Sequence, residues 1–129
     1  MYSNQNLLKM AQFRFVDLEI WKLAIQISMK LFDIADRLEG KKLFRFAEQL
    51  RAAGLSLTNN IAEGSGSFTN ADFSNFLKFS RRSVFECANM VYILRLRNHI
   101  TEDEKTELWN DLEFLSRSIV NFKKTILRS

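Results

Sequence analysis

The sequence predicts an all-α protein, folded as an antiparallel four-helix bundle with up-down-up-down connections. Two features of the composition favour long helices: the 129 residues include no proline and only four glycines. The third observation is periodicity, because apolar residues recur at alternating spacings of three and four along four long segments. With 47% hydrophobic residues, we expect one domain over residues 1–129, in which 1–14 form a partly ordered N-terminal extension.

The first helix is predicted from about Asp17 to Leu38, with an acidic first turn that suits the positive end of the helix dipole. Its expected buried seam consists of Leu18, Trp21, Ile25, Ser28, Phe32 and Ala35. We expect Gly40 to end this helix, since glycine is a common residue at helix C-termini.

The second helix is predicted from about Lys42 to Glu63, ending before the Gly-Ser-Gly-Ser run at 64–67. Its expected seam consists of Leu43, Ala47, Leu50, Gly54, Leu57 and Ile61. A glycine inside a helix costs about 1 kcal/mol relative to alanine. We therefore expect a neighbouring helix to pack closely against Gly54.

The third helix is predicted from Thr69, a good N-cap residue, to about His99. Its expected seam consists of Phe73, Leu77, Ser80, Val84, Cys87, Val91 and Leu94. From Val84 to Leu96 apolar residues lie on nearly every side of the helix, which is typical of a helix buried all round. This pattern predicts a subunit interface, the alternative being a monomer with exposed apolar side chains.

The fourth helix is predicted to begin after Thr101, which forms a capping box with Glu104. Its seam consists of Leu108, Leu112, Leu115, Ile119, Phe122 and Ile126. Acidic residues lead this helix and basic residues end it, so both ends complement the helix dipole. The short connections require consecutive helices to run antiparallel.

The sequence offers no recognisable catalytic chemistry. Its only histidine, His99, is expected to cap a helix end, and its only cysteine, Cys87, lies on a buried seam. One histidine and one cysteine cannot form a zinc site, and no Glu-x-x-His pair suggests a carboxylate-bridged metal. We therefore expect no enzyme activity, no cofactor and no metal. Without a signal peptide or a membrane-spanning stretch, we expect a cytoplasmic protein.

The chain is mildly basic, with a net charge of +4 and a pI near 9.4, which permits nucleic-acid binding. The candidate contacts are Lys41, Lys42, Arg45, Lys78, Arg82, Arg95, Arg97, Lys123 and Lys124. The antiparallel arrangement brings the first three of these, with Arg95 and Arg97, to one end of the bundle. The alternative is a solvated surface of mixed charge.

Polar residues of the second and third helices form a second candidate group, which consists of Arg51, Asn60, Glu63, Arg81, Ser83 and Glu86. A hairpin turn near Ser67 places Arg51 level with Ser83 and about one turn from Glu86. We expect ion pairs among Arg51, Glu86 and Arg81 that fix the helix register or an interface. A polar site that contacts a ligand is the alternative.

The run RAAGLSLTNNIAEG at 51–64 resembles the motif RRAAxSIxxNIAEG of a family of four-helix bundle proteins. These proteins are encoded in intervening sequences of bacterial 23S ribosomal RNA genes. The opening FVDLEIW at 15–21 and the segment at 76–86 are similar to two further motifs of that family. The chain departs from the pattern at Thr58, often proline in the family, which should straighten the second helix, and at Arg82, often glycine.

The resemblance implies a cytoplasmic bacterial protein that assembles as a homopentamer. It also implies kinship with the accessory variability protein of diversity-generating retroelements, a basic pentamer that binds nucleic acid and a reverse transcriptase. Together with the basic residues, it predicts a non-catalytic oligomeric scaffold associated with RNA or DNA, with structured RNA the expected ligand. A protein–protein adaptor that binds no nucleic acid is the alternative.

Overall fold

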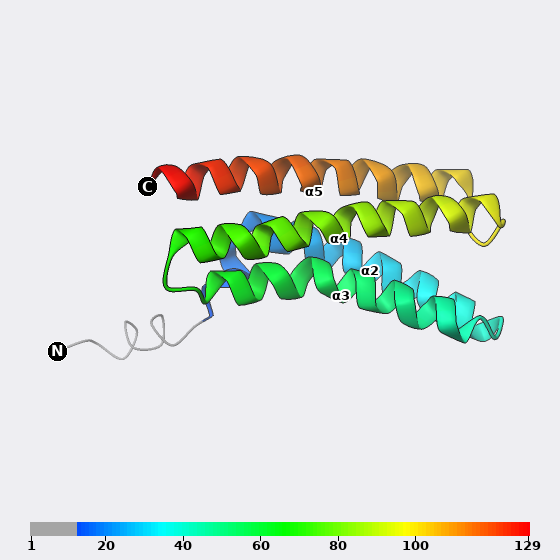
Figure 1. Cartoon of the computed structure of the whole chain (residues 1–129). Coiled ribbons are helices and arrows are strands. Elements are labelled where there is room, and N and C mark those ends of the chain that lie inside the picture. The colour runs from blue at the N-terminus through cyan, green and yellow to red at the C-terminus, as the bar shows by residue number, and fades with distance from the viewer. Residues whose placement is uncertain (1–12) are drawn as a thin grey trace.

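The structure, a computed structural model, describes residues 13–129, and these form one short and four long helices (Figure 1). The 3-10 helix η1 spans Arg14–Asp17, and the long helices are α2 (Glu19–Gly40), α3 (Phe44–Ser65), α4 (Asn70–Leu96) and α5 (Glu102–Arg128). Consecutive helices lie side by side and reverse direction, and α5 also packs against α2. The predicted all-α, up-down-up-down bundle is confirmed. Residues 1–12 of the predicted N-terminal extension lie outside the described part of the chain.

The predicted starts of α4 and α5 are confirmed at the level of single hydrogen bonds. The hydroxyl of Thr69 accepts a hydrogen bond from the Asp72 backbone N–H at 3.1 Å. At α5 the Thr101 hydroxyl accepts from the Glu104 N–H at 3.1 Å, and the Glu104 carboxylate accepts from the Thr101 N–H at 3.0 Å. These bonds satisfy amides that have no partner within the helix.

Helix α2 ends at Gly40, as predicted. The left-handed residue of the following turn is Lys42, whose φ is 65°, and the Leu43 N–H donates to the Leu38 carbonyl at 2.9 Å. Asn98 has the same role after α4, with φ 60°. The left-handed conformation falls two residues after the last helical residue in both cases, so Lys42 occupies a position that favours glycine.

The hydrophobic core contains the predicted seams of α3, α4 and α5 with few exceptions. All seven residues predicted for α4 are buried, whereas Leu43 of the α3 seam is exposed. In α2 the predicted seam is displaced by about one position. The buried row of α2 consists of Ile20, Ala24, Ile27, Ser28, Leu31, Ile34, Ala35 and Leu38. Leu18, Trp21, Ile25 and Phe32 are half-buried, because α2 has two adjacent apolar rows and only one lies between its neighbours.

The predicted close approach at Gly54 is confirmed. A β-carbon at this position would lie 3.3 Å from Cε1 of Phe32 on α2. The small residue also exposes its carbonyl to α2, where the buried Ser28 hydroxyl donates to it at 2.7 Å. From the other side of α3, the buried Ser80 hydroxyl of α4 donates to the Leu57 carbonyl at 2.9 Å. Four residues after Gly54, Thr58 lies within the uninterrupted helix α3.

The contact between α2 and α5 depends partly on ion pairs. The Lys30 ammonium of α2 lies 2.7 Å from a Glu107 carboxylate oxygen and 2.8 Å from one of Asp111. Nearer the end of α2, Arg37 lies 2.6 Å from Glu104.

No helix within residues 13–129 has both the length and the hydropathy needed to cross a bilayer.

Candidate nucleic-acid interface

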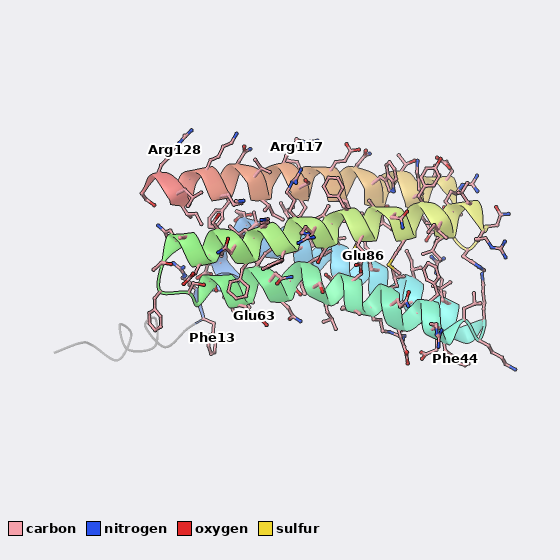
Figure 2. The ribbon with its side chains drawn as sticks, viewed as in Figure 1. Phe13, Phe44, Glu63, Glu86, Arg117 and Arg128 are labelled. Carbon is pink, nitrogen blue, oxygen red and sulfur yellow. The ribbon has the colours of Figure 1, made fainter. Side chains whose placement is uncertain are left out.

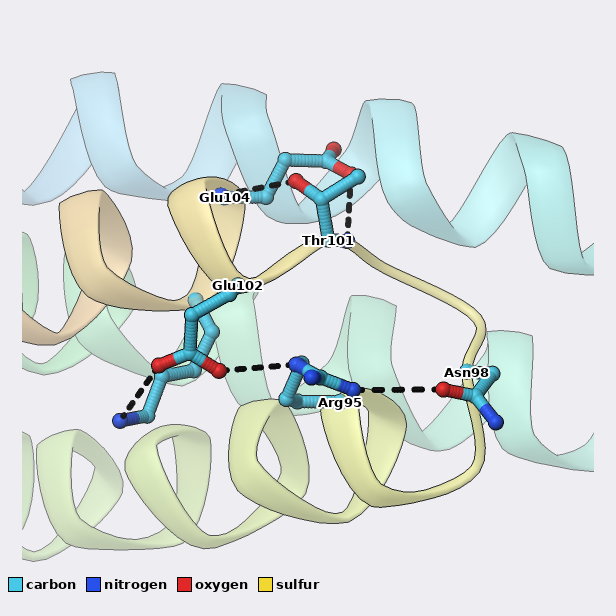
Figure 3. A network of polar contacts seen from close by, with 6 residues as sticks. Arg95, Asn98, Thr101, Glu102 and Glu104 are labelled. Carbon is cyan, nitrogen blue, oxygen red and sulfur yellow. Dashed lines mark hydrogen bonds and ion pairs between the residues drawn. The ribbon is translucent and has the colours of Figure 1, made fainter.

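One end of the bundle, here called the loop end, contains the connections at 41–43 and 97–101 (Figure 1). The predicted basic residues Lys41, Lys42, Arg45 and Arg97 are exposed there. Arg95 is engaged: its Nε–H donates to Glu102 at 2.8 Å, and a terminal N–H donates to the Asn98 side chain at 3.2 Å (Figure 3). The antiparallel bundle therefore places these residues at one end, as predicted.

Acidic residues balance the charge of the loop end. The hydrogen bond from Arg95 lowers the pKa of Glu102. Burial opposes ionisation of Glu104, but the hydrogen bonds that it accepts from Thr101 and Arg37 outweigh this effect and lower its pKa. The half of the bundle next to the loop end, residues 31–51 and 87–112, contains eight basic and nine acidic residues. This half of the bundle therefore has no basic surplus.

The basic surplus lies on the other half of the α4–α5 pair, here called the basic face and defined as residues 70–86 and 113–128. This face has seven basic residues and three acidic ones. Its basic residues are Lys78, Arg81, Arg82, Arg117, Lys123, Lys124 and Arg128. Figure 2 shows Arg117 and Arg128 along α5, away from the loop end. Because α4 and α5 run antiparallel, the first half of one helix lies level with the second half of the other.

The basic residues of this face are largely free of carboxylate partners. Arg117 lies 3.9 Å from Glu113 in an exposed pair, a separation at which such pairs contribute little. Among residues 13–129 none of the other six forms an ion pair. The guanidinium of Arg81 lies 5.0 Å from the centroid of the Phe85 ring. Such cations are available to an external anion.

The candidate list from the sequence includes Lys78, Arg82, Lys123 and Lys124 of the basic face. It lacks Arg117 and Arg128 and assigns Arg81 to a different group. The sequence alone does not show how α4 is aligned with α5. Basic residues spaced along two helices become one surface only when the helices are aligned.

The predicted polar network of α3 and α4 does not form, and the expected pairing of Arg51 with Glu86 is wrong. Arg51 pairs with Asp36 at 2.6 Å and Glu39 at 3.1 Å, both on α2, and these hydrogen bonds raise the pKa of Arg51. The side chain of Arg51 extends from the flank of α3 that faces α2. Arg51 and Glu86 lie at similar heights along the bundle, but Arg51 does not reach Glu86, which lies exposed on α4 (Figure 2).

The remaining members of that group make local contacts. Asn60 donates to the Ser56 carbonyl at 2.9 Å, and Ser83 donates to the Phe79 carbonyl at 3.2 Å, each within its own helix. Glu63 is exposed near the end of α3 (Figure 2) and forms no ion pair with the described residues. These six residues therefore do not converge on one site.

A groove of about 350 Å³ runs between α4 and α5 and overlaps the basic face. Its lining consists of Val84, Phe85, Ala88, Trp109, Leu112, Glu113, Ser116 and Arg117. The Trp109 indole N–H donates to the Ala88 carbonyl at 3.1 Å, which fixes the ring at one end of the groove. The Lys105 ammonium lies 4.7 Å from the centroid of the same ring.

Cys87 is buried in the core, and His99 lies in the connection after α4. Burial, with a smaller contribution from the charge of Glu86, raises the pKa of the Cys87 thiol to about 12, so the nucleophilic thiolate is not formed near neutral pH. His99 follows α4, and its backbone N–H donates to the Leu94 carbonyl at 2.9 Å. Residues 13–129 contain no group of three histidine, cysteine, aspartate or glutamate side chains positioned to hold a metal ion.

Comparison with known proteins gives a family match over most of the chain. The family model described as 23S rRNA-intervening sequence protein matches residues 16–121. A similar fold is found in the crystal structure of a protein of unknown function from the S23 ribosomal protein family of Bacteroides thetaiotaomicron, with a TM-score of 0.76. The two chains are 19% identical, and the match covers 81% of this chain and 98% of the other. A comparison with curated proteins gives no match.

Proposed function

The chain belongs to the family of 23S rRNA-intervening sequence proteins, and we propose that it acts as a non-catalytic oligomeric scaffold that binds structured RNA through the basic face. Family membership provides the fold and an association with ribosomal RNA genes, but no activity follows from it. The binding proposal therefore rests on the charges of the described residues.

The observation that supports binding is the concentration of cations on the basic face, of which all but Arg117 form no ion pair within residues 13–129. The basic face contains seven basic and three acidic residues, whereas the rest of the α4–α5 pair is acidic overall. Each phosphate that such cations neutralise releases condensed counterions, which favours binding without regard to sequence. A helical RNA presents regular rows of phosphates to a surface of this kind.

Self-association is supported by apolar side chains exposed at the loop end. Phe44 is 53% exposed, Ile93 38% and Leu96 65%. The charges of this half are balanced, so copies could approach there without strong repulsion. The family resemblance implies a pentamer, whose native mass would be five times 15.1 kDa. A native mass of 15.1 kDa would overturn the oligomer. We propose the cytoplasm as the location, where ribosomal RNA is present and the lone Cys87 stays reduced.

A titration of two charge-reversal variants tests the site. The test variant changes Lys78, Arg82 and Lys124 to Glu, and the control changes Lys41, Lys42 and Arg45 to Glu. Both remove the same charge from exposed positions, but from opposite ends of the bundle. We would measure fluorescence anisotropy of a labelled RNA hairpin and a DNA duplex at about 50 and about 200 mM salt, the range in which phosphate contacts weaken. Native mass spectrometry would verify that both variants keep the wild-type assembly.

For the wild type, we expect affinity to fall steeply with salt. The test variant should bind on the order of tenfold or more weakly and show a shallower salt dependence, since each lost phosphate contact lowers the slope by about 0.7–0.9. The control variant should stay close to wild type. A larger loss in the control would move the site to the loop end, as the sequence first indicated.

A protein–protein adaptor is the second candidate function, and the apolar α4–α5 groove supports it. Absence of RNA and DNA binding at low salt would favour this alternative. Pull-downs with the wild type and with a groove variant such as Phe85→Glu would then identify partners that depend on the groove.

A further inference from the structure

We infer that the groove between α4 and α5 holds unpaired nucleotides of the bound nucleic acid, with phosphates on its basic rim and a base stacked at Phe85 and Arg81. This inference rests on the proposed function and deepens it. It assigns the recognised element to loops, bulges or single strands and not to the paired stems of a structured RNA.

The groove combines an apolar floor with arginines at its edge and one carboxylate, that of Glu113, in its lining. Val84 and Leu112 are buried core residues whose edges form the floor. Arg117 lines the rim directly, and Arg81 reaches the groove through its contact with Phe85. Channels that bind single strands pair apolar or aromatic surface for bases with cations that follow the backbone.

Phe85 and Arg81 form a ready stacking platform. Phe85 lines the groove and is 58% exposed, although water disfavours such a large apolar surface. The guanidinium of Arg81 covers the ring at 5.0 Å from its centroid and has no carboxylate partner among residues 13–129. Unpaired bases stack on aromatic rings and on guanidinium planes, and Arg81 adds a charge for the adjoining phosphate.

The size of the groove excludes a duplex. A volume of about 350 Å³ lies near the lower end of the range for small-ligand pockets, so the groove admits a flat base but not a paired helix. A duplex could touch only the cations of the rim. The affinity for single strands is therefore expected to depend on Phe85, and the affinity for a duplex is not. Both affinities are expected to depend on the basic residues.

Two polar side chains of α5 support a base over a phosphate at the centre of the groove. Glu113 and Ser116 both line it. A carboxylate beside a phosphate is repulsive, whereas a carboxylate accepts hydrogen bonds from the exocyclic amino groups of bases. Glu113 thus lies among the cations at the centre of the groove, where we place a base.

The test compares two phenylalanine variants against two ligands. Phe85→Leu removes the aromatic ring from the groove and keeps an apolar side chain. Phe114→Leu is the matched control, because Phe114 is 51% exposed at a similar level of α5 but does not line the groove. Anisotropy at about 50 mM salt would be measured with labelled 20-nucleotide oligouridine and oligothymidine and with a 20-base-pair duplex. Circular dichroism would verify folding of each variant.

We expect the single strands to bind the wild type more tightly than the duplex does. Phe85→Leu should weaken single-strand binding on the order of tenfold, the usual effect of losing one stacked base, and leave duplex binding unchanged. Phe114→Leu should change neither. Equal affinity for all ligands, with no effect of Phe85→Leu, would overturn the inference while phosphate binding by the basic face still stood. Loss of all binding in the wild type would overturn both proposals.

Trp109 provides a second measurement that does not depend on affinity. The chain has two tryptophans, so Trp21→Phe leaves the groove residue Trp109 as the only one. Oligouridine should quench its fluorescence, and the duplex should not. Quenching by neither ligand would contradict occupation of the groove. A change in native mass caused by Phe85→Leu, without a change in single-strand affinity, would assign the groove to a second copy of the chain and overturn the inference.

Discussion

Gly64 gives a direct test of the packing between α3 and α4. A β-carbon at Gly64 would lie 2.7 Å from Cβ of Phe76 and 2.8 Å from Cδ1 of Phe73. The Cβ of Phe76 is tied to the α4 backbone and cannot rotate away. The Phe73 ring is held by Phe122, at 5.4 Å between ring centroids, and by the Arg14 guanidinium at 5.5 Å. Relief therefore requires α3 and α4 to separate by about 1 Å, to ordinary carbon contacts.

The expected cost of Gly64→Ala follows from two opposing effects. Overpacking a rigid site costs about 1–3 kcal/mol, and replacing a helical glycine by alanine returns up to about 1 kcal/mol. We expect a net loss of about 1–2 kcal/mol in the free energy of unfolding. With an urea dependence of about 2 kcal/mol per molar, the midpoint of unfolding falls by about 0.5–1 M.

Two other glycines provide controls for the same substitution. At Gly40 a new β-carbon meets no atom within 4 Å, so Gly40→Ala should raise stability by up to about 1 kcal/mol. At Gly54 the nearest atom is Cε1 of the Phe32 ring, at 3.3 Å, and Gly54→Ala should fall between the other two. Urea unfolding followed by circular dichroism, at one protein concentration, measures all three. A Gly64→Ala variant as stable as the wild type would refute the packing argument.

Three further predictions concern single residues. Lys42→Gly should raise the free energy of unfolding by about 1 kcal/mol, because glycine adopts φ 65° without strain; an unchanged urea midpoint would contradict this. Burial opposes ionisation of Glu104, but the hydrogen bonds that it accepts from Thr101 and Arg37 outweigh burial and lower its pKa. The stabilisation of the fold by this carboxylate is therefore present above the ordinary pKa of 4.5 and is lost as pH falls through the pKa of the folded state. Urea midpoints between pH 6 and pH 3 should therefore depend less on pH in Glu104→Gln than in the wild type. Burial foremost raises the pKa of Cys87 from 9.0 to about 12, so stability should fall as pH rises from about 9 toward 12, and native protein at pH 8 should resist alkylation that unfolded protein undergoes. Rapid alkylation without unfolding would show that the thiol is accessible.

The sequence predicts the helices and most of the core because local periodicity determines them. The α4 seam is correct throughout, although Phe85, Tyr92, Ile93 and Leu96 add exposed apolar side chains outside it. The α2 seam is correct only at Ser28 and Ala35, because Ile20 and Trp21 begin two adjacent apolar rows and only the positions of α3 and α5 decide which row is buried. The end of α2 at Gly40 is correct, whereas residue type alone does not predict that the left-handed residue after it is Lys42.

The candidate site is harder to predict because it depends on pairs of helices. Arg51 and Glu86 lie at similar levels, but the angular position of Arg51 around α3 directs it to Asp36 of α2. The acidic residues that neutralise the loop end are visible in the sequence, yet their effect depends on contacts such as that of Arg95 with Glu102. The basic face likewise requires the alignment of α4 with α5, which no single helix encodes.

Two of the buried serines, Ser28 and Ser80, have a consequence for how far the helices can slide. An apolar seam that repeats every seven residues tolerates a displacement of about 10 Å along the bundle, since leucine would again meet leucine. Ser28 and Ser80 do not permit this, because each reaches one carbonyl of α3, at Gly54 and Leu57. Displacement would break both hydrogen bonds, and a hydroxyl that remained buried without a partner would cost about 1–3 kcal/mol. Held from both flanks, α3 thus selects one alignment among several that hydrophobic contact alone would allow.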